Sequence, residues 1–236
     1  MNSPIIIALD FPKPELALEL IEKLEHKRCR VKIGKELFTR SGPALVEKLI
    51  TKEFEVFLDL KYHDIPNTVA NACSIATDLG VWMVNVHALG GRDMMLAAKE
   101  AIDKYTTQPL LIAVSILTSL EQNDLVAVGL QGTVADNVLR LANLANNCGL
   151  DGMVCSPLEI TMLRKNLDNN FKLVTPGIRP MTVSDDQKRT MTPVQALQNG
   201  ADYLVIGRPI TAASDPLQAL LNIETSIADF KKLTNN

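Results

Sequence analysis

Two carboxylates and an ammonium lie within six residues, at Asp59, Lys61 and Asp64, directly after the apolar run 56–58. In an extended strand Asp59 and Lys61 are two residues apart, so they point to the same face. Charged groups that face the inside of a sheet are costly unless they are paired or functional. This stretch is therefore the first candidate for chemistry in the chain.

A second lysine, Lys32, lies in the preceding predicted strand. An ammonium beside carboxylates keeps its proton, because opposite charges favour the charged form. Such a lysine suits proton donation, whereas a Schiff-base lysine needs an apolar or cationic neighbourhood in order to lose its proton. We therefore expect a proton-donating array of Lys32, Asp59, Lys61 and Asp64, with a buried salt-bridge network between two strands as the structural alternative. Mg²⁺ held by Asp59 and Asp64 is disfavoured, because both lysines would oppose the cation.

Eight short apolar runs, which alternate with longer helical patterns, must position these groups. The predicted strands are Ile5–Leu9, Arg30–Ile33, Glu55–Leu60, Trp82–Val86, Leu110–Ser115, Gly152–Cys155, Lys172–Thr175 and Tyr203–Ile206. The predicted helices are Lys13–Leu24, Gly42–Ile50, Asn67–Leu79, Arg92–Ile102, Thr133–Cys148, Pro157–Lys165, Pro193–Gln198 and Asp215–Lys231. This alternation predicts a parallel sheet that closes into a single (β/α)8 barrel domain over residues 1–236. A doubly wound open sheet is the alternative, but no glycine-rich dinucleotide loop follows the first strand.

In such a barrel the site lies at the C-terminal ends of the strands. Polar residues follow these predicted ends, among them Asp10, Asn85, His87, Ser115, Thr118, Ser119, Arg179 and Arg208. Loops after the seventh and eighth strands commonly hold phosphate, Gly207 lets the backbone approach, and Arg179 and Arg208 offer forked donors. We expect a phosphate site there, with two ordinary surface arginines as the alternative.

Composition excludes several classes of function. The net charge of −3 argues against a nucleic-acid surface, and no apolar run approaches the ~20 residues of a membrane span. No basic segment precedes the first apolar run, so we expect no secretory signal and a cytoplasmic protein. The cysteines show no CxxC spacing and are expected to be reduced structural thiols: Cys29, Cys73, Cys148 and Cys155. No Ser or Cys stands beside a plausible base, and His63 is out of phase with Asp59 and Lys61, so triad chemistry is disfavoured.

The segment 59–68, DLKYHDIPNT, resembles the signature of the orotidine 5′-phosphate decarboxylase family. Segments 8–10, 31–38, 117–119, 175–180 and 205–209 follow in family order, and together they cover nearly the whole chain. A related group of Mg²⁺-dependent keto-sugar-phosphate decarboxylases and aldolases shares the Asp-x-Lys-x-x-Asp spacing but carries a Glu metal ligand where this chain has Lys32. The resemblance therefore favours the metal-free nucleotide enzyme on a TIM barrel.

The resemblance also implies a role for each matching residue. Lys61 would donate a proton to C6 of the pyrimidine, within the charged array of Lys32, Asp59 and Asp64. Asp64 and Thr68 would reach into the neighbouring subunit's site in a homodimer. The remaining implied contacts are ribose hydroxyls for Asp10 and Lys32, the pyrimidine edge for Thr118 and Ser119, and the phosphate for Arg179, Gln187, Gly207 and Arg208, with 179–189 as a closing lid.

The implied reaction converts orotidine 5′-phosphate (OMP) to UMP and CO₂ without a cofactor. Loss of CO₂ leaves a carbanion in the ring plane, which Lys61 would stabilise electrostatically. Asp59 would add repulsion of the departing carboxylate, and phosphate binding would drive lid closure. Two other functions stay open: the Mg²⁺-dependent keto-sugar-phosphate enzyme, and a non-catalytic nucleotide-binding barrel, which has little reason to keep four clustered charges.

Overall fold

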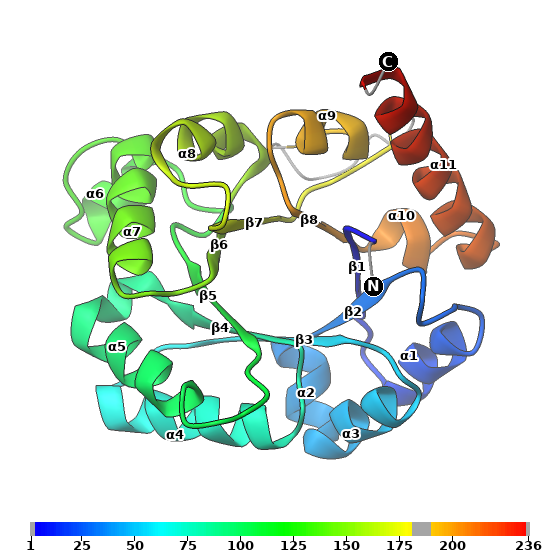
Figure 1. Cartoon of the computed structure of the whole chain (residues 1–236), viewed down its shortest axis with the longest axis horizontal. Helices are drawn as coiled ribbons and strands as arrows, with labels where there is room; N and C mark the ends of the chain where they lie inside the picture. The colour runs from blue at the N-terminus through cyan, green and yellow to red at the C-terminus, as the bar shows by residue number, and fades with distance from the viewer. Residues whose placement is uncertain (1–2, 181–189, 235–236) are drawn as a thin grey trace.

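Eight parallel strands close into one barrel in the computed structural model, which describes residues 3–180 and 190–234 (Figure 1). The strands are β1 (Ile5–Ala8), β2 (Arg30–Gly34), β3 (Val56–Tyr62), β4 (Met83–His87), β5 (Leu110–Val114), β6 (Gly152–Val154), β7 (Lys172–Thr175) and β8 (Tyr203–Ile206). Each strand pairs with its neighbours in sequence, and β8 closes the barrel on β1. The predicted TIM barrel is confirmed.

The helices surround the strands in Figure 1. They are α1 (Pro14–Ile21), α2 (Lys35–Ser41), α3 (Pro43–Thr51), α4 (Pro66–Asp78), α5 (Gly91–Ile102), α6 (Gln122–Ala127), α7 (Val134–Asn147), α8 (Ile160–Asn166), α9 (Pro193–Gln198), α10 (Arg208–Thr211) and α11 (Pro216–Thr234), with short 3₁₀ turns η1 (Ala88–Gly90) and η2 (Pro157–Glu159). Every predicted helix is present: Pro193–Gln198 has the predicted bounds and the others differ at one or both ends, whereas α2, α6 and α10 were not predicted. None of these three exceeds seven residues, so each shows little of a helical period, although α9 is as short and was predicted.

An apolar layer fills the inside of the barrel, and it consists of Ile6, Ala8, Phe57, Met83, Ile112, Val174 and Val205. The intervening residues Ile5 and Ile7 belong to the larger core between strands and helices. Because side chains alternate between faces, Asp59 continues the inner face two residues beyond Phe57. Lys32 is in register with Ala8 on one side and Phe57 on the other. The charged groups therefore lie directly above the apolar filling.

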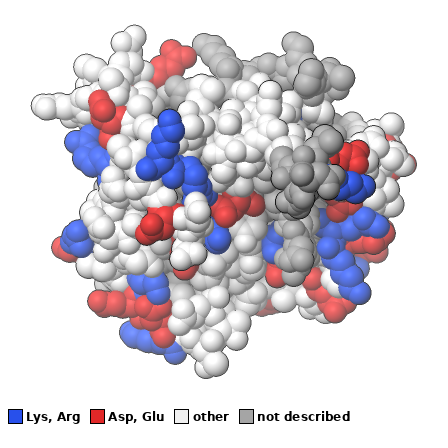
Figure 2. Space-filling model, turned by 45° about the horizontal axis from the view of Figure 1, so that its top comes forward, with Lys and Arg blue, Asp and Glu red and all other residues white. Residues whose placement is uncertain are grey.

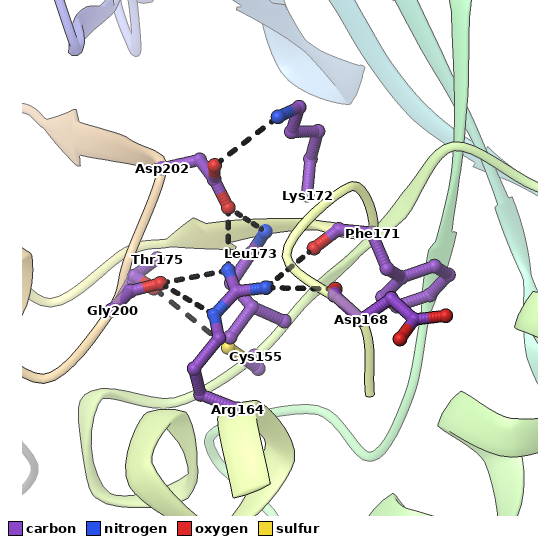
Figure 3. Close-up of polar contacts among 9 residues, drawn as sticks. All are labelled: Cys155, Arg164, Asp168, Phe171, Lys172, Leu173, Thr175, Gly200 and Asp202. Atoms are coloured by element: carbon purple, nitrogen blue, oxygen red, sulfur yellow. Dashed lines mark hydrogen bonds and ion pairs between the residues drawn. The ribbon is translucent and has the colours of Figure 1, made fainter. Parts of the chain in front are cut away.

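At the opposite, N-terminal end of the strands, Arg164 of α8 ties β7 to β8 (Figure 3). Its guanidinium donates to the carbonyl oxygens of Gly200, Asp168 and Phe171 and pairs with Asp202 at 2.6 Å. Gly200 has a φ of +105°, and an added Cβ would lie 3.1 Å from Arg164 Nε, so glycine is required here. Residues at this end of a TIM barrel serve stability rather than chemistry.

Basic and acidic side chains are interspersed on the face shown in Figure 2. The described residues of this face form no continuous basic surface of the kind that binds nucleic-acid backbones. No helix in the described part of the chain is long and apolar enough to cross a membrane.

Candidate active site

A cavity of about 440 Å³ opens at the C-terminal ends of the strands. It is lined by most of the residues predicted for the site, namely Asp10, Lys32, Asp59, Lys61, Thr118, Arg179, Gly207 and Arg208. These residues come from both halves of the chain, and barrel closure brings them to one rim. A volume of this size fits a small-molecule ligand.

Four charges of alternating sign form a chain across one side of this cavity. Lys32 Nζ lies 3.1 Å from Asp10 Oδ1 and 3.2 Å from Asp59 Oδ2. Lys61 Nζ lies 2.7 Å from the other oxygen, Asp59 Oδ1. Lys32 and Asp59 are buried, whereas the Asp10 side chain is 65% exposed. The predicted pairing of Lys32, Asp59 and Lys61 is therefore confirmed, and in the single chain Asp10 rather than Asp64 completes this row of charges.

The buried members of the chain stabilise each other's charge. Burial alone would raise the pKa of Asp59, but the ammoniums of Lys32 and Lys61 hold it below its usual value. Burial alone would likewise lower the pKa of Lys32, but the carboxylates of Asp59 and Asp10 raise it above its usual value. Both groups are therefore ionised near neutral pH.

Lys61 is held by an irregular stretch of β3. From Leu58 to Tyr62 this strand advances four residues, while the paired β4 advances only two, from Val84 to Val86. Lys61 has a φ of +53°, in the left-handed region that non-glycine residues seldom adopt. Bulges beside active sites re-aim side chains in this way. Asp59 and Lys61 do meet as predicted, but through a bulge rather than through regular alternation.

Asn85 of β4 is a site residue that sequence reasoning noted only as a strand end. Its Oδ1 accepts the backbone N–H of Lys61 at 2.7 Å, and its Nδ2 donates to Asp59 Oδ1 at 2.7 Å. The side chain is fully buried. The available signal was a lone amide inside the apolar run Met83–Val86, on the face that points into the barrel.

Two arginines and a glycine lie on another part of the cavity wall, after β7 and β8. Arg179 is buried and donates to the carbonyl oxygen of Ile178 at 3.0 Å. Gly207 precedes α10, and Arg208 is the first residue of that helix. The prediction that these residues converge is confirmed, and a role as an ordinary surface arginine does not describe Arg179. Thr211 of α10 also lines the cavity and was not predicted.

Three other predicted residues, Asp64, Thr68 and Ser119, are not part of the cavity lining. Asp64, Thr68 and Ser119 are exposed, and Asp64 Oδ1 accepts the backbone N–H of Ile65 at 2.6 Å. Gln187 lies outside the described residues, as does most of the predicted lid. The structure of the single chain therefore brings none of Asp64, Thr68 and Ser119 into the charged chain.

The two histidines near the site pack on one another. The rings of His63 and His87 are stacked with centroids 5.2 Å apart. Burial, together with the nearby charges of His63, Lys35 and Lys61, lowers the pKa of His87 to about 4. His63 is exposed, in agreement with its prediction as a residue outside the barrel interior. His87 is therefore neutral at physiological pH.

The donor set does not fit a divalent cation. Both oxygens of Asp59 are engaged by ammonium groups, at 2.7 and 3.2 Å, where a metal would require free oxygens. Among the described residues, no three His, Cys, Asp or Glu side chains are grouped so as to hold a metal.

Comparison with known proteins agrees with this geometry. Residues 3–223 match the family model described as "Orotidine 5'-phosphate decarboxylase / HUMPS family". The chain is 59% identical to the orotidine 5′-phosphate decarboxylase of Hydrogenovibrio crunogenus (94% of this chain and 95% of that one), and 57% identical to that of Nitrosospira multiformis (99% and 98%). The crystal structure of orotidine 5′-phosphate decarboxylase from Lactobacillus acidophilus superposes with a TM-score of 0.87 at 39% identity, covering 96% of this chain and 99% of that one. The chain therefore belongs to the orotidine 5′-phosphate decarboxylase family, as a carboxy-lyase of the bacterial type.

Proposed function

We propose that this protein converts OMP to UMP and CO₂, the step that forms UMP in pyrimidine biosynthesis, by electrostatic catalysis without a metal or cofactor. One observation carries the proposal: the chain Asp10–Lys32–Asp59–Lys61 shares a single cavity with Arg179, Gly207 and Arg208. OMP carries a phosphate and a carboxylate, so a cavity with cationic groups at two places matches both of its charged ends.

The proposed binding mode follows the positions of the lining residues. Arg179, Arg208 and the backbone at Gly207 hold the phosphate, since guanidinium forks match phosphate oxygens. Asp10 and Lys32 contact the ribose hydroxyls, and Thr118 contacts the pyrimidine edge. Ser119 and Gln187 belong to the same proposal as further contacts to the pyrimidine and the phosphate.

The proposed reaction has two steps. The bond from C6 to the carboxylate breaks, CO₂ leaves, and the electron pair stays on C6 in the plane of the ring. The Lys61 ammonium, held 2.7 Å from Asp59, stabilises this charge because it is in place before charge develops. Lys61 then donates its proton to C6 to form UMP, and its neutral amine recovers a proton from water. Asp59 contributes by repelling the substrate carboxylate in the ground state.

We further propose a homodimer in which Asp64 and Thr68 enter the partner's site. Both residues are exposed in the single chain, and the apolar side chains of Ile65 and Ile75 nearby in sequence are 67% and 61% exposed. Mixing Lys61→Ala with Asp64→Ala subunits restores activity if each heterodimer contains one intact site. Isolated heterodimers that stay inactive would refute shared sites. The cytoplasmic location expected from the sequence stays a prediction.

The test of the function is direct. Purified protein treated with EDTA is expected to consume OMP, followed by the change in pyrimidine absorbance, and to release UMP. Lys61→Ala is expected to lose this turnover while it still binds UMP. Loss of wild-type activity on EDTA treatment, restored by Mg²⁺, would instead favour the keto-sugar-phosphate branch, and near-normal turnover by Lys61→Ala would refute the proton donor.

A further inference from the structure

The bulge in β3 leaves the backbone of Lys61 without the regular partners of a parallel ladder. Between the pairs Leu58–Val84 and Tyr62–Val86 the register of the two strands shifts, and Lys61 adopts its left-handed φ of +53° within that interval. A buried backbone N–H without a partner is costly, so something other than the ladder must accept it. That acceptor is the side chain of Asn85, at 2.7 Å.

The same amide also reaches the carboxylate that pairs with the Lys61 ammonium. Asn85 Nδ2 donates to Asp59 Oδ1 at 2.7 Å, and Lys61 Nζ donates to that same oxygen at 2.7 Å. The planar amide of Asn85 therefore contacts both the backbone of Lys61, the proposed proton donor, and the carboxylate of Asp59, which pairs with the Lys61 ammonium. The two partners fix the orientation of the amide, since only Nδ2 can face a carboxylate and only Oδ1 can face an N–H.

We propose that Asn85 is a positioning residue for decarboxylation, which holds the Lys61 ammonium against Asp59 in the geometry that proton transfer to C6 requires. The inference rests on the proposed function and deepens it. Asn85 is fully buried and is not part of the cavity lining, so it acts through Lys61 and Asp59 rather than on the substrate. A displacement of about 1 Å at a reacting group can lower a rate by about 100-fold.

The first variant is Asn85→Leu, which keeps the volume of the side chain and removes both hydrogen bonds. We expect kcat for OMP to fall about 100-fold, with the Kd of UMP within about threefold of wild type, because phosphate and ribose contacts lie on other elements. The matched control is Asn137→Leu in α7. Asn137 is also buried and donates to the carbonyl oxygens of Gln131 and Thr133, but it lies outside the cavity lining. The Asn137→Leu variant is expected to lose stability with little change in kcat.

The second variant, Asn85→Asp, gives a pH signature that a merely structural role would not produce. The new carboxyl group can replace the amide only while protonated, when its O–H donates to Asp59 and its carbonyl accepts the Lys61 N–H. The groups that face it are Asp59 and Lys61 of β3, with Lys32 of β2 beyond Asp59. The carboxylates of Asp59 and of the new aspartate are close enough to share a proton, so the pKa of one of them is raised. We expect the ratio of the variant's kcat to the wild-type kcat to be at least about tenfold higher at pH 5.5 than at pH 8.5.

These measurements separate the inference from the function on which it rests. Wild-type protein that fails to decarboxylate OMP refutes the proposed function, and a crystal structure of Asn85→Leu then decides the positioning role. The expected structure has Lys61 outside its left-handed conformation, or a Lys61 Nζ to Asp59 Oδ1 distance lengthened from 2.7 Å to beyond about 4 Å. The positioning role is overturned by an unchanged geometry, by kcat within threefold of wild type in folded Asn85→Leu, by kcat and UMP affinity that fall together, or by an Asn85→Asp profile parallel to wild type.

Discussion

The left-handed backbone of Lys61 predicts an unusual order of stability for two substitutions that both abolish activity. A Cβ in this left-handed conformation destabilises the fold by about 1–2 kcal/mol, and glycine avoids this cost because it has no Cβ. Lys61→Ala and Lys61→Gly lose the same ammonium and the same 2.7 Å bond to Asp59, but only the alanine variant keeps the Cβ at a φ of +53°. The difference between them therefore isolates the backbone conformation.

The magnitude follows from two opposing effects. Replacing alanine with glycine usually destabilises by about 0.4–1 kcal/mol through the entropy of the unfolded chain. Relief of about 1–2 kcal/mol of strain at Lys61 exceeds that loss, so Lys61→Gly is expected to be more stable than Lys61→Ala by roughly 0.5–1 kcal/mol. For a chain of this length, that difference raises the melting temperature by about 1–4 °C.

The assay is thermal and urea denaturation of both variants, with the same pair of substitutions at Glu47 as a control. Glu47 is exposed in the middle of α3, where alanine is expected to exceed glycine by about 1 kcal/mol. The reasoning fails if Lys61→Ala equals or exceeds Lys61→Gly in stability while the control pair behaves normally. The expected reversal would show that the fold tolerates local strain in order to aim a functional side chain.

Three further predictions concern the charged chain and the opposite end of the barrel. The ammoniums of Lys32 and Lys61 outweigh burial and lower the pKa of Asp59 below its usual 3.8. The Asp59 carboxylate therefore stabilises the fold at pH values above 3.8, and this stabilisation is lost as the pH falls through the lowered pKa. The free energy of unfolding in urea should depend less on pH between about 6 and 3 in Asp59→Asn than in wild type, and an equal dependence would contradict this. In Gly34→Ala the new Cβ lies 3.3 Å from both Asp10 Oδ1 and Lys32 Nζ, so kcat/KM for OMP should fall about tenfold, and an unchanged value would count against the tight fit. Arg164→Leu removes the side-chain donor of the Gly200 and Phe171 carbonyl oxygens and one partner of Asp202, which keeps Lys172 and the Leu173 N–H. Urea unfolding should therefore show a loss of about 1–3 kcal/mol with kcat retained, whereas wild-type stability would contradict the tie between β7 and β8.

Much of the fold was predictable because its signals are local. The strands 172–175 and 203–206 were predicted with the bounds that the structure shows, and the other six differ by one or two residues at their ends. Short β-branched runs between helical patterns carry that information within a few residues. The convergence of Arg179, Gly207 and Arg208 also followed from sequence, since strand order in a closed barrel places consecutive strand ends side by side.

Some features of the site were not predictable from local pattern. Asn85 reads as one polar residue in an apolar strand until its contacts with Lys61, 24 residues earlier in the chain, are seen. Regular strand alternation predicted correctly that Asp59 and Lys61 meet, but the structure brings them together through a bulge. A bulge depends on the pairing of two strands, so it could not be predicted from the sequence of one. The short helices α2, α6 and α10 span fewer than two full turns, so little of a helical period can appear in them.

The sequence by itself determined that eight strands alternate with helices and that ionisable residues follow the strands, because apolar burial imposes a period on neighbouring residues. Only the tertiary structure decided which charges pair. Asp10 rather than Asp64 joins Lys32 and Asp59, and one buried amide connects the backbone of Lys61 to the carboxylate of its partner. Ion pairs and hydrogen bonds depend on separations of about 3 Å. Such separations are set by strand register and barrel closure, which join residues distant in the chain.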